Sequence, residues 1–323
     1  MRKIVLIILA LVLLASCSAP VFNPFQFTSN PFLEKYWISD ETITTGDTIS
    51  FSVTTDNHFD RADSTWYNEN YYSFLKSKNY PFAISLGDIT DTGVFTENAL
   101  SFAETVKSLT TATNPTTKEK GFFTTCVGNH DRHSVDSTRW DTEDEKYKTA
   151  RCYYYGKTDD GRPLLAIYKL DNSYDCITDR QFRYFEEALK KETARYRMII
   201  IHENVSTGNT PGPTLVLFGL SSAETNRLYR IMSENNVGLI LSGHNHIGNV
   251  EYHLNDTLGE LNMAAYHRKK NAFLNMESPG YFYDFTLNTE TGDVVIKGYL
   301  AETTKDATAK ADKTFTFRLP ESD

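Results

Sequence analysis

The chain has 323 residues, enough for one large domain or two small ones. Its hydrophobic content of 40% and aromatic content of 13% are typical of a globular protein with a packed core. The formal net charge of -9 argues against a general nucleic-acid partner, because nothing offsets phosphate repulsion over the molecule as a whole.

The first residues resemble an export signal. Arg2 and Lys3 form a positively charged start, and Ile4 to Leu14 form an apolar run too short to span a bilayer comfortably. The small residues before Cys17 resemble the lipobox of bacterial lipoproteins, in which the chain is cut before the cysteine and the cysteine is lipidated. An ordinary signal peptide or an uncleaved anchor is the alternative.

We therefore expect three segments in the chain. Residues 1–16 would be a signal peptide, residues 17–44 a tether and lead-in, and residues 45–323 a single domain. Acyl chains on Cys17 would hold that domain outside the cytoplasm, on a bacterial cell membrane at the periplasmic face or the cell surface.

Three further cysteines allow at most one disulfide within the chain. Cys126 ends an apolar run, which predicts a buried core thiol. Cys152 and Cys176 flank an expected hairpin and could pair in an oxidising compartment, but the sequence gives no Cα distance between them and leaves this open.

Strands and helices alternate over most of the chain. β-Branched and apolar runs predict strands at Thr48–Thr54, Pro81–Leu86, Phe122–Val127, Leu164–Leu170, Arg197–Ile201 and Val237–Leu241. Apolar residues three and four apart predict helices at Ser64–Lys78, Glu97–Leu109, Thr178–Glu192 and Ser222–Asn235. Thr178 is the expected N-cap of the third helix. This alternation favours a layered α/β fold with its chemistry at the C-terminal ends of the strands.

The pattern changes after His246, where no long helix is expected. Strands are predicted at Leu258–Ala265, Gly280–Leu287, Asp293–Leu300 and Thr314–Leu319. We expect these strands to complete a second sheet, so that the fold is an α/β sandwich. The polar segment from Lys305 to Lys313 is expected to be a surface loop.

Five fragments rich in carboxylate, amide and imidazole groups each follow a predicted strand. They are Asp56-Asn57-His58, Gly87-Asp88-Ile89-Thr90-Asp91, Gly128-Asn129-His130-Asp131, His202 and Gly243-His244-Asn245-His246. Taken singly, each is more often a turn or a solvated side chain. Together they hold five of the eight histidines and supply donors for two adjacent divalent metal ions. Each glycine is expected to let the backbone turn sharply, so that the next side chain faces the metals.

In this order, the five fragments resemble the complete signature of the calcineurin-like metallophosphoesterase superfamily, over roughly residues 50 to 250. The resemblance implies a four-layer α/β/β/α sandwich in which helices flank two mixed sheets. It also implies hydrolysis of a phosphomonoester or phosphodiester by attack of a metal-bridging hydroxide.

The resemblance implies a set of metal ligands. The first metal would take Asp56, His58, Asp88 and His246, and the second would take Asp88, Asn129, His202 and His244. Asp88 would therefore bridge the two ions. Oxygen and imidazole donors suit Mn, Fe, Zn or Co.

Two further residues of the signature have expected roles in catalysis. His130 is similar to the family's catalytic histidine, which contacts the phosphate and protonates the leaving group. Asp131 would orient that imidazole and raise its pKa, with a helix cap as the alternative. Asp91 stands where the purple acid phosphatase branch has a ligating tyrosine, so we expect it to hydrogen bond a metal ligand or to cap a helix.

The substrate is less well defined. Asn57 and His133 are candidate substrate-binding residues, whereas His253 and His267 are expected to be structural or solvated. Four cations either approach the cleft or belong to a solvated segment: Arg132, Arg139, Lys146 and Arg151.

A cationic clamp would favour a phosphomonoester and an open groove a diester. The sequence leans towards a diester or nucleotide-type substrate, and nucleic acid enters only as a substrate of this kind. A non-catalytic surface lipoprotein that uses the fold for binding is the alternative function. The oligomeric state stays open.

Overall fold

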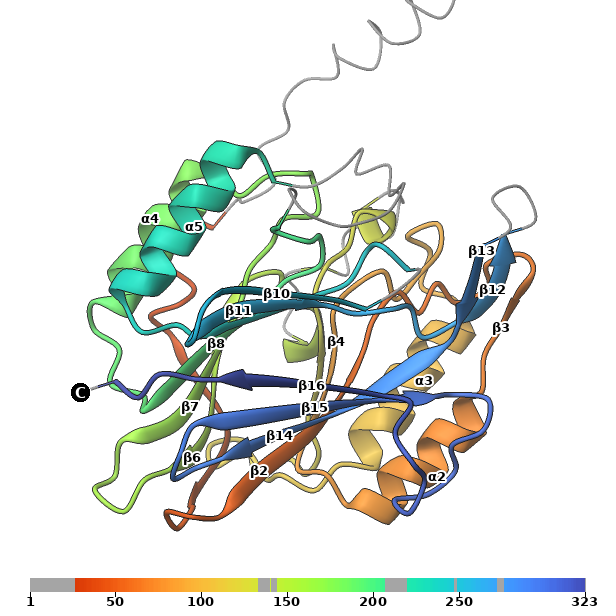
Figure 1. The fold of residues 1–323 in the computed structure, drawn as a ribbon, viewed down its shortest axis with the longest axis horizontal. Coiled ribbons are helices and arrows are strands. Elements are labelled where there is room, and N and C mark those ends of the chain that lie inside the picture. Colours follow the sequence, from red (N-terminus) through yellow and green to blue (C-terminus); the bar gives the residue numbers. More distant parts are fainter. Residues whose placement is uncertain are drawn as a thin grey trace, which may run out of the picture.

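The computed structural model describes residues 27–132, 140, 144–206, 220–246, 249–271 and 276–322. Two large mixed sheets pack face to face, and helices cover their outer faces (Figure 1). This is the predicted α/β sandwich. The signal peptide, Cys17, His133 and Arg139 lie outside the described residues.

The first sheet has seven strands. Their order across the sheet is β1 (Lys35–Thr42), β6 (Arg151–Lys157), β7 (Pro163–Lys169), β8 (Tyr196–Ile200), β9 (Leu239–Ser242), β11 (Leu258–Asn262) and β10 (Val250–Asn255). The run from β7 to β11 is parallel. The predicted strands in this region are confirmed to within a few residues at each end.

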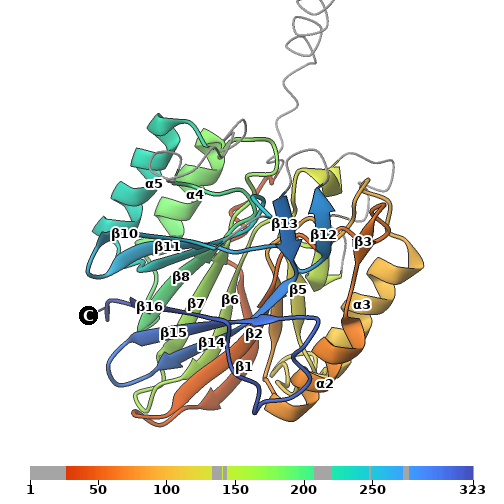
Figure 2. The ribbon, with the colours of Figure 1, turned by 45° about the vertical axis from the view of Figure 1, so that its right-hand side comes forward.

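The second sheet has six strands. Their order is β16 (Lys313–Arg318), β15 (Asp293–Leu300), β14 (Tyr281–Asn288), β2 (Thr48–Thr54), β4 (Ala83–Ser85) and β5 (Phe123–Thr125). Strands β2, β4 and β5 are parallel, so their C-terminal ends meet at one edge of the sheet. A small third sheet joins β13 (Met276–Pro279), β12 (Arg268–Asn271) and β3 (Ser64–Thr65) (Figure 2).

Two helices cover each large sheet. α2 (Asn68–Lys78) and α3 (Glu97–Ser108) pack on the six-stranded sheet, whereas α4 (Asp179–Leu189) and α5 (Ser222–Glu234) pack on the seven-stranded sheet (Figure 1). Thr178 caps α4 as predicted, because its hydroxyl accepts a hydrogen bond from Gln181 N at 3.2 Å.

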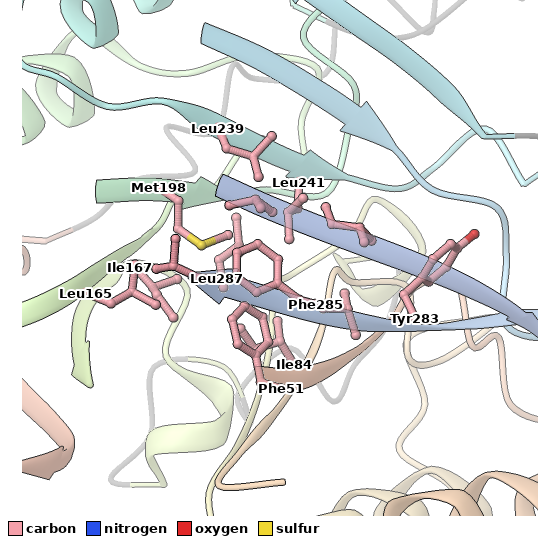
Figure 3. Packing of buried hydrophobic residues seen from close by; sticks show 14 of the residues in the cluster. Phe51, Ile84, Leu165, Ile167, Met198, Leu239, Leu241, Tyr283, Phe285 and Leu287 are labelled. Carbon is pink, nitrogen blue, oxygen red and sulfur yellow. The ribbon is translucent and has the colours of Figure 1, made fainter. Parts of the chain in front are cut away.

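The main core fills the space between the two sheets. Phe51 stacks on Phe82 and Phe285, with ring centroids 4.5 and 4.3 Å away. The side chains that face them across the core come from the other sheet and include Leu165, Ile167, Met198, Leu239 and Leu241 (Figure 3). These residues are 0% exposed, so the strand ends that carry the five fragments rest on a closely packed base.

Two predicted elements differ in the structure. Residues 64 and 65 form strand β3, which pairs with β12, and α2 begins only at Asn68. The strand predicted at Leu258–Ala265 ends at Asn262 and joins the seven-stranded sheet, where it pairs in parallel with β9. The prediction was wrong because this long-range pairing is not visible in the sequence. Only β14, β15 and β16 complete the second sheet.

Strand β1 lies within the segment that we expected to be a lead-in, and it pairs in parallel with β6. The packed part of the chain therefore starts before residue 45. Cys126 is buried, as predicted, and neither Cys152 nor Cys176 forms a disulfide among the described residues. In the part of the chain that the structure describes, no helix is long and apolar enough to cross a membrane.

Candidate metal centre

The fragments leave their strands through left-handed backbone turns. Within the five fragments, the residues other than glycine that have positive φ are Asp56 (49°), His58 (43°), Asp88 (49°), His244 (74°) and His246 (59°). Such residues are uncommon and gather where function requires a particular side-chain direction. All five are predicted metal ligands, although residues outside the fragments, such as Asp60 and Asp63, also have positive φ.

The turns are locked by hydrogen bonds between the first two fragments. Asp56 N donates to Gly87 O at 2.9 Å, and His58 N donates to Asp88 O at 2.8 Å. Because β2 and β4 are parallel neighbours, their C-terminal loops run side by side and can exchange these bonds.

The prediction that the glycines allow sharp turns holds for Gly87 but not for Gly128 and Gly243. Only Gly87 has a left-handed φ, of 106°. At Gly128 an added Cβ would lie 2.6 Å from Asp88 N and 2.7 Å from Asp88 Cγ, and at Gly243 it would lie 2.7 Å from Asp56 Oδ2. Gly128 and Gly243 are therefore required because another chain segment occupies the space of a side chain.

The first donor cluster joins Asp56, His58, Asp88 and His246. His246 Nε2 lies 3.1 Å from Asp56 Oδ1 and 3.1 Å from His58 Nε2. His58 Nε2 lies 3.4 Å from Asp88 Oδ2. The other oxygen of Asp56 is already occupied, because Oδ2 accepts hydrogen bonds from Thr55 Oγ1 and His244 N, both at 2.8 Å.

The second donor cluster joins Asp88, His202 and His244, with Asn129 beside them. His202 Nε2 lies 3.2 Å from Asp88 Oδ2 and 3.2 Å from Asn129 Oδ1, which is 3.1 Å from His244 Nδ1. His202 Nδ1 donates to Leu86 O at 2.9 Å, which directs Nε2 into the cluster. Asp88 Oδ2 thus lies between the two clusters.

The donor set fits two divalent cations. Asp56 Oδ1 and Asp88 Oδ2 are buried and accept no hydrogen bond, although leaving a buried carboxylate oxygen without a partner is costly. Both atoms point at imidazole nitrogens, and two Nε2 atoms face each other at 3.1 Å. A cation in each cluster would satisfy these atoms, and mixed oxygen and imidazole donors suit Mn, Fe, Zn or Co.

Electrostatics within the clusters support the same interpretation. Burial lowers the pKa of His58, but the carboxylates of Asp56 and Asp88 outweigh it and raise that pKa to about 9. His202 shows the same balance, and Asp88 raises its pKa to about 10. Burial and the charge of His202 lower the pKa of His244 to about 4. Without metal, protons on His58 and His202 therefore compensate the carboxylates, and a cation would displace them.

His130 lies at the edge of the first cluster. Its Nδ1 donates to the backbone carbonyl of Asp91 at 2.7 Å and lies 3.9 Å from Asp91 Oδ1. The same carboxylate oxygen lies 3.2 Å from His58 Nδ1. The Asp91 carboxylate therefore lies beside both a predicted ligand and the predicted catalytic histidine.

Asp131 does not take the role that we expected. Its Oδ2 accepts a hydrogen bond from Gly128 N at 2.9 Å, and its Oδ1 accepts from Thr90 N at 3.1 Å and Thr90 Oγ1 at 3.0 Å. The carboxylate is fully buried and holds two loops together, so it does not reach the imidazole of His130. Burial lowers the pKa of His130, whereas Asp131 was expected to raise it.

The described residues that were predicted to contact the substrate have other partners in the structure. Asn57 is fully buried, and its Oδ1 accepts a hydrogen bond from Ser85 Oγ at 2.9 Å, so its side chain supports the loop and does not face a substrate. The described cations that we considered for the cleft are all paired with carboxylates: Arg132 with Asp171, Lys146 with Glu104 and Asp144, and Arg151 with Glu34 and Glu145.

His267 is structural, one of the two alternatives expected for it, but its place beside the clusters was not predicted, and Arg61 was not considered at all. His267 is fully buried, donates from Nδ1 to Asp56 O at 2.7 Å, and has its ring edge against His58 and His246. Burial and the charges of these two histidines lower its pKa to about 3, so it stays neutral. Arg61 lies beside Asp91, with Nε 3.5 Å from Asp91 Oδ1. Its position three residues after His58 was the one signal in the sequence.

The chain is similar in fold to several solved structures. For GAP50, described as the anchor in the inner membrane complex of Plasmodium, the TM-score is 0.57 at 15% identity, over 85% of this chain and 90% of that chain. For the purple acid phosphatase PPD1 from yellow lupin seeds it is 0.55 at 10% identity, over 85% and 55%. For a dimetal phosphatase from Danio rerio it is 0.52 at 11% identity, over 84% and 99%. Identities this low establish the fold alone.

At the level of sequence, no curated protein matches the chain. The family model of the calcineurin-like phosphoesterases matches residues 49–248, a range that contains every residue of the two donor clusters. The chain therefore belongs to the calcineurin-like phosphoesterase family.

Proposed function

We propose that the protein is a phosphoesterase that works with two divalent metal ions. The observation that carries this proposal is the position of Asp88 Oδ2, 3.4 Å from His58 Nε2 and 3.2 Å from His202 Nε2. One carboxylate oxygen thereby serves two donor clusters, and it accepts no hydrogen bond of its own. Asp56, His58 and His246 would complete the first metal position, and Asn129, His202 and His244 the second.

Each residue has a distinct task in this mechanism. When bound, the two cations would supply an activated water and withdraw charge from the phosphoryl group. His130 Nδ1 donates a hydrogen bond to the backbone carbonyl of Asp91, so Nε2 is the nitrogen that would pass a proton to the leaving oxygen. Asp131 and Asn57 hold the loops in place and take no part in proton transfer.

The role of His130 is tested by substitution. His130→Ala should lower kcat roughly 10²–10⁴-fold, the usual contribution of general acid catalysis, while two metal ions stay bound. His253→Ala is the matched control, because His253 is 48% exposed on β10 and contacts Glu251. Turnover that survives in the His130 variant would contradict the assigned role.

A second candidate function is a binding module without catalysis. The similarity to GAP50, which is described as an anchor, favours it. The complete donor set argues against it, because a protein that only binds has no need of two unsatisfied buried carboxylate oxygens. Assays with p-nitrophenyl phosphate and bis-p-nitrophenyl phosphate in Mn²⁺ decide between them: two bound ions without turnover of any ester would favour the binding module.

We also propose that the domain is exported and anchored to a bacterial membrane by lipid on Cys17. The charged start, the apolar run and the small residues before Cys17 support this proposal. Cells that express the full chain should incorporate labelled palmitate, and Cys17→Ala should abolish the labelling. Labelling that persists in the variant would refute lipidation at this cysteine.

A further inference from the structure

Part of the metal centre is buried and part is exposed. Asp56, His58, Asp88 and His202 are fully buried. In contrast, the side chains of His246, Arg61, Asp91 and His130 are 21%, 23%, 25% and 32% exposed. These four side chains lie where the centre is partly exposed, together with Asn129, His244 and Asn245.

A backbone hydrogen bond to His58 fixes the position of Arg61 beside the exposed part of the centre. Arg61 N donates to His58 O at 3.0 Å, so the residue is part of the same turn that carries the predicted ligand. Its Nε lies 3.5 Å from Asp91 Oδ1, a loose contact for an ion pair. Its Nη1 has no hydrogen-bond partner among the described residues. This atom is buried, so at least one donor of the guanidinium is left without a protein partner among the described residues.

The cations that the sequence offered for the cleft are engaged elsewhere. Lys146 lies 2.9 Å from both Glu104 and Asp144, and Arg151 lies 2.9 Å from Glu145. Arg132 pairs with Asp171. Within the described ranges, Arg61 is the cation that the structure places beside both Asp91 and the clusters.

We propose that Arg61 binds a terminal oxygen of the substrate's phosphoryl group and makes the centre selective for phosphomonoester dianions. This rests on the proposed phosphoesterase function and deepens it. A monoester dianion has three terminal oxygens and two negative charges, whereas a diester has two terminal oxygens and one charge. The monoester therefore offers an additional anionic oxygen to a guanidinium at the exposed part of the centre, where a diester carries an esterified group. This proposal differs from the sequence analysis, which favoured a diester or nucleotide-type substrate.

The test compares Arg61→Gln and Arg61→Lys with the wild type in the Mn²⁺-loaded protein. Binding of inorganic phosphate is measured by calorimetry, and kcat/KM is measured for p-nitrophenyl phosphate and bis-p-nitrophenyl phosphate. Arg61→Gln should weaken phosphate binding and lower monoester kcat/KM roughly 10–100-fold, the usual loss for a hydrogen bond to a charged group. Diester kcat/KM should fall less than about 3-fold, and Arg61→Lys should lie between Gln and wild type because it keeps the charge but not the planar fork.

Arg162→Gln is the matched control, since Arg162 pairs with Asp160 in the turn between β6 and β7 and should leave all three quantities unchanged. Unchanged phosphate affinity in Arg61→Gln, or an equal loss for both esters, would overturn the proposal and make Arg61 a positioning residue for Asp91. A variant that melts earlier than wild type is replaced by Arg61→Lys for the same comparison. If the wild type hydrolyses neither ester, the proposed function fails, and phosphate calorimetry still decides whether Arg61 binds the anion.

Discussion

Gly128→Ala tests whether this glycine is required for space or for flexibility. Its φ is not in the left-handed region, so its backbone conformation is open to alanine. With room for the methyl group, Ala would stabilise the protein by about 0.4–1 kcal/mol, because it restricts the unfolded chain. The structure instead predicts that Ala destabilises the protein, because the Cβ would lie 2.6 Å from Asp88 N and overlap the buried Asp88 carboxylate.

The expected loss of stability in Gly128→Ala depends on which atoms must move to make room for the methyl group. Overpacking costs about 1–3 kcal/mol, and the upper end applies because the obstructing atoms are backbone and a fully buried side chain. A loss of about 3 kcal/mol lowers the melting temperature by roughly 5–10 °C. Since Asp88 Oδ2 serves both donor clusters, its displacement should weaken both metal positions, roughly 10–100-fold each.

The assay combines a thermal melt of the metal-free protein with calorimetric titration of Mn²⁺. Gly161→Ala is the control, because Gly161 has a φ of 83° but nothing within 4 Å of an added Cβ. It should cost about 1–2 kcal/mol through backbone strain and leave metal affinity unchanged. If Gly128→Ala melted at or above the wild-type temperature and bound Mn²⁺ normally, the steric reasoning would be refuted.

Three further predictions concern the centre. In the metal-free protein the raised pKa values of His58 and His202, about 9 and 10, keep both imidazoles protonated at pH 7. Mn²⁺ affinity should therefore rise from pH 6 to pH 9, and binding should release protons. Calorimetry in buffers of different ionisation enthalpy measures the proton release, and an affinity that does not change with pH would contradict the prediction. By linkage, these histidines stabilise the metal-free fold fully below about pH 6.5, and that contribution is lost as the pH rises through 9 to 10. Asp131→Asn should cost about 1–3 kcal/mol in urea denaturation, because an amide group would face the N–H donors that now bind the carboxylate; unchanged stability with a collapsed kcat would instead support the original assignment to His130. Asp91→Asn should weaken the first metal roughly 10–100-fold through His58 and spare the second, and equal weakening of both would exclude this path.

The order and type of the elements were predictable because they depend on local pattern. The strand at Thr48–Thr54 was predicted at its exact bounds, and the helix after Thr178 was predicted from its cap and apolar spacing. The sheet that each strand joins was less predictable. β11 was predicted to join the same sheet as β14 but pairs with β9, since strand pairing depends on packing between distant segments.

The chemistry of the centre was likewise visible in the sequence, because donor types and their position after strands are local properties. The assignment of ligands from Asp56 to His246 came from the resemblance to the metallophosphoesterase family, and the fold brings these residues into two clusters. What surrounds those ligands was decided only by the tertiary structure. The space at Gly128 depends on Asp88, 40 positions earlier, and the partners of Asp131 and Arg61 lie on a neighbouring loop. Such contacts arise from the packing of parallel strand ends, so the sequence determined which donor groups are present, whereas the structure decided which side chains surround them.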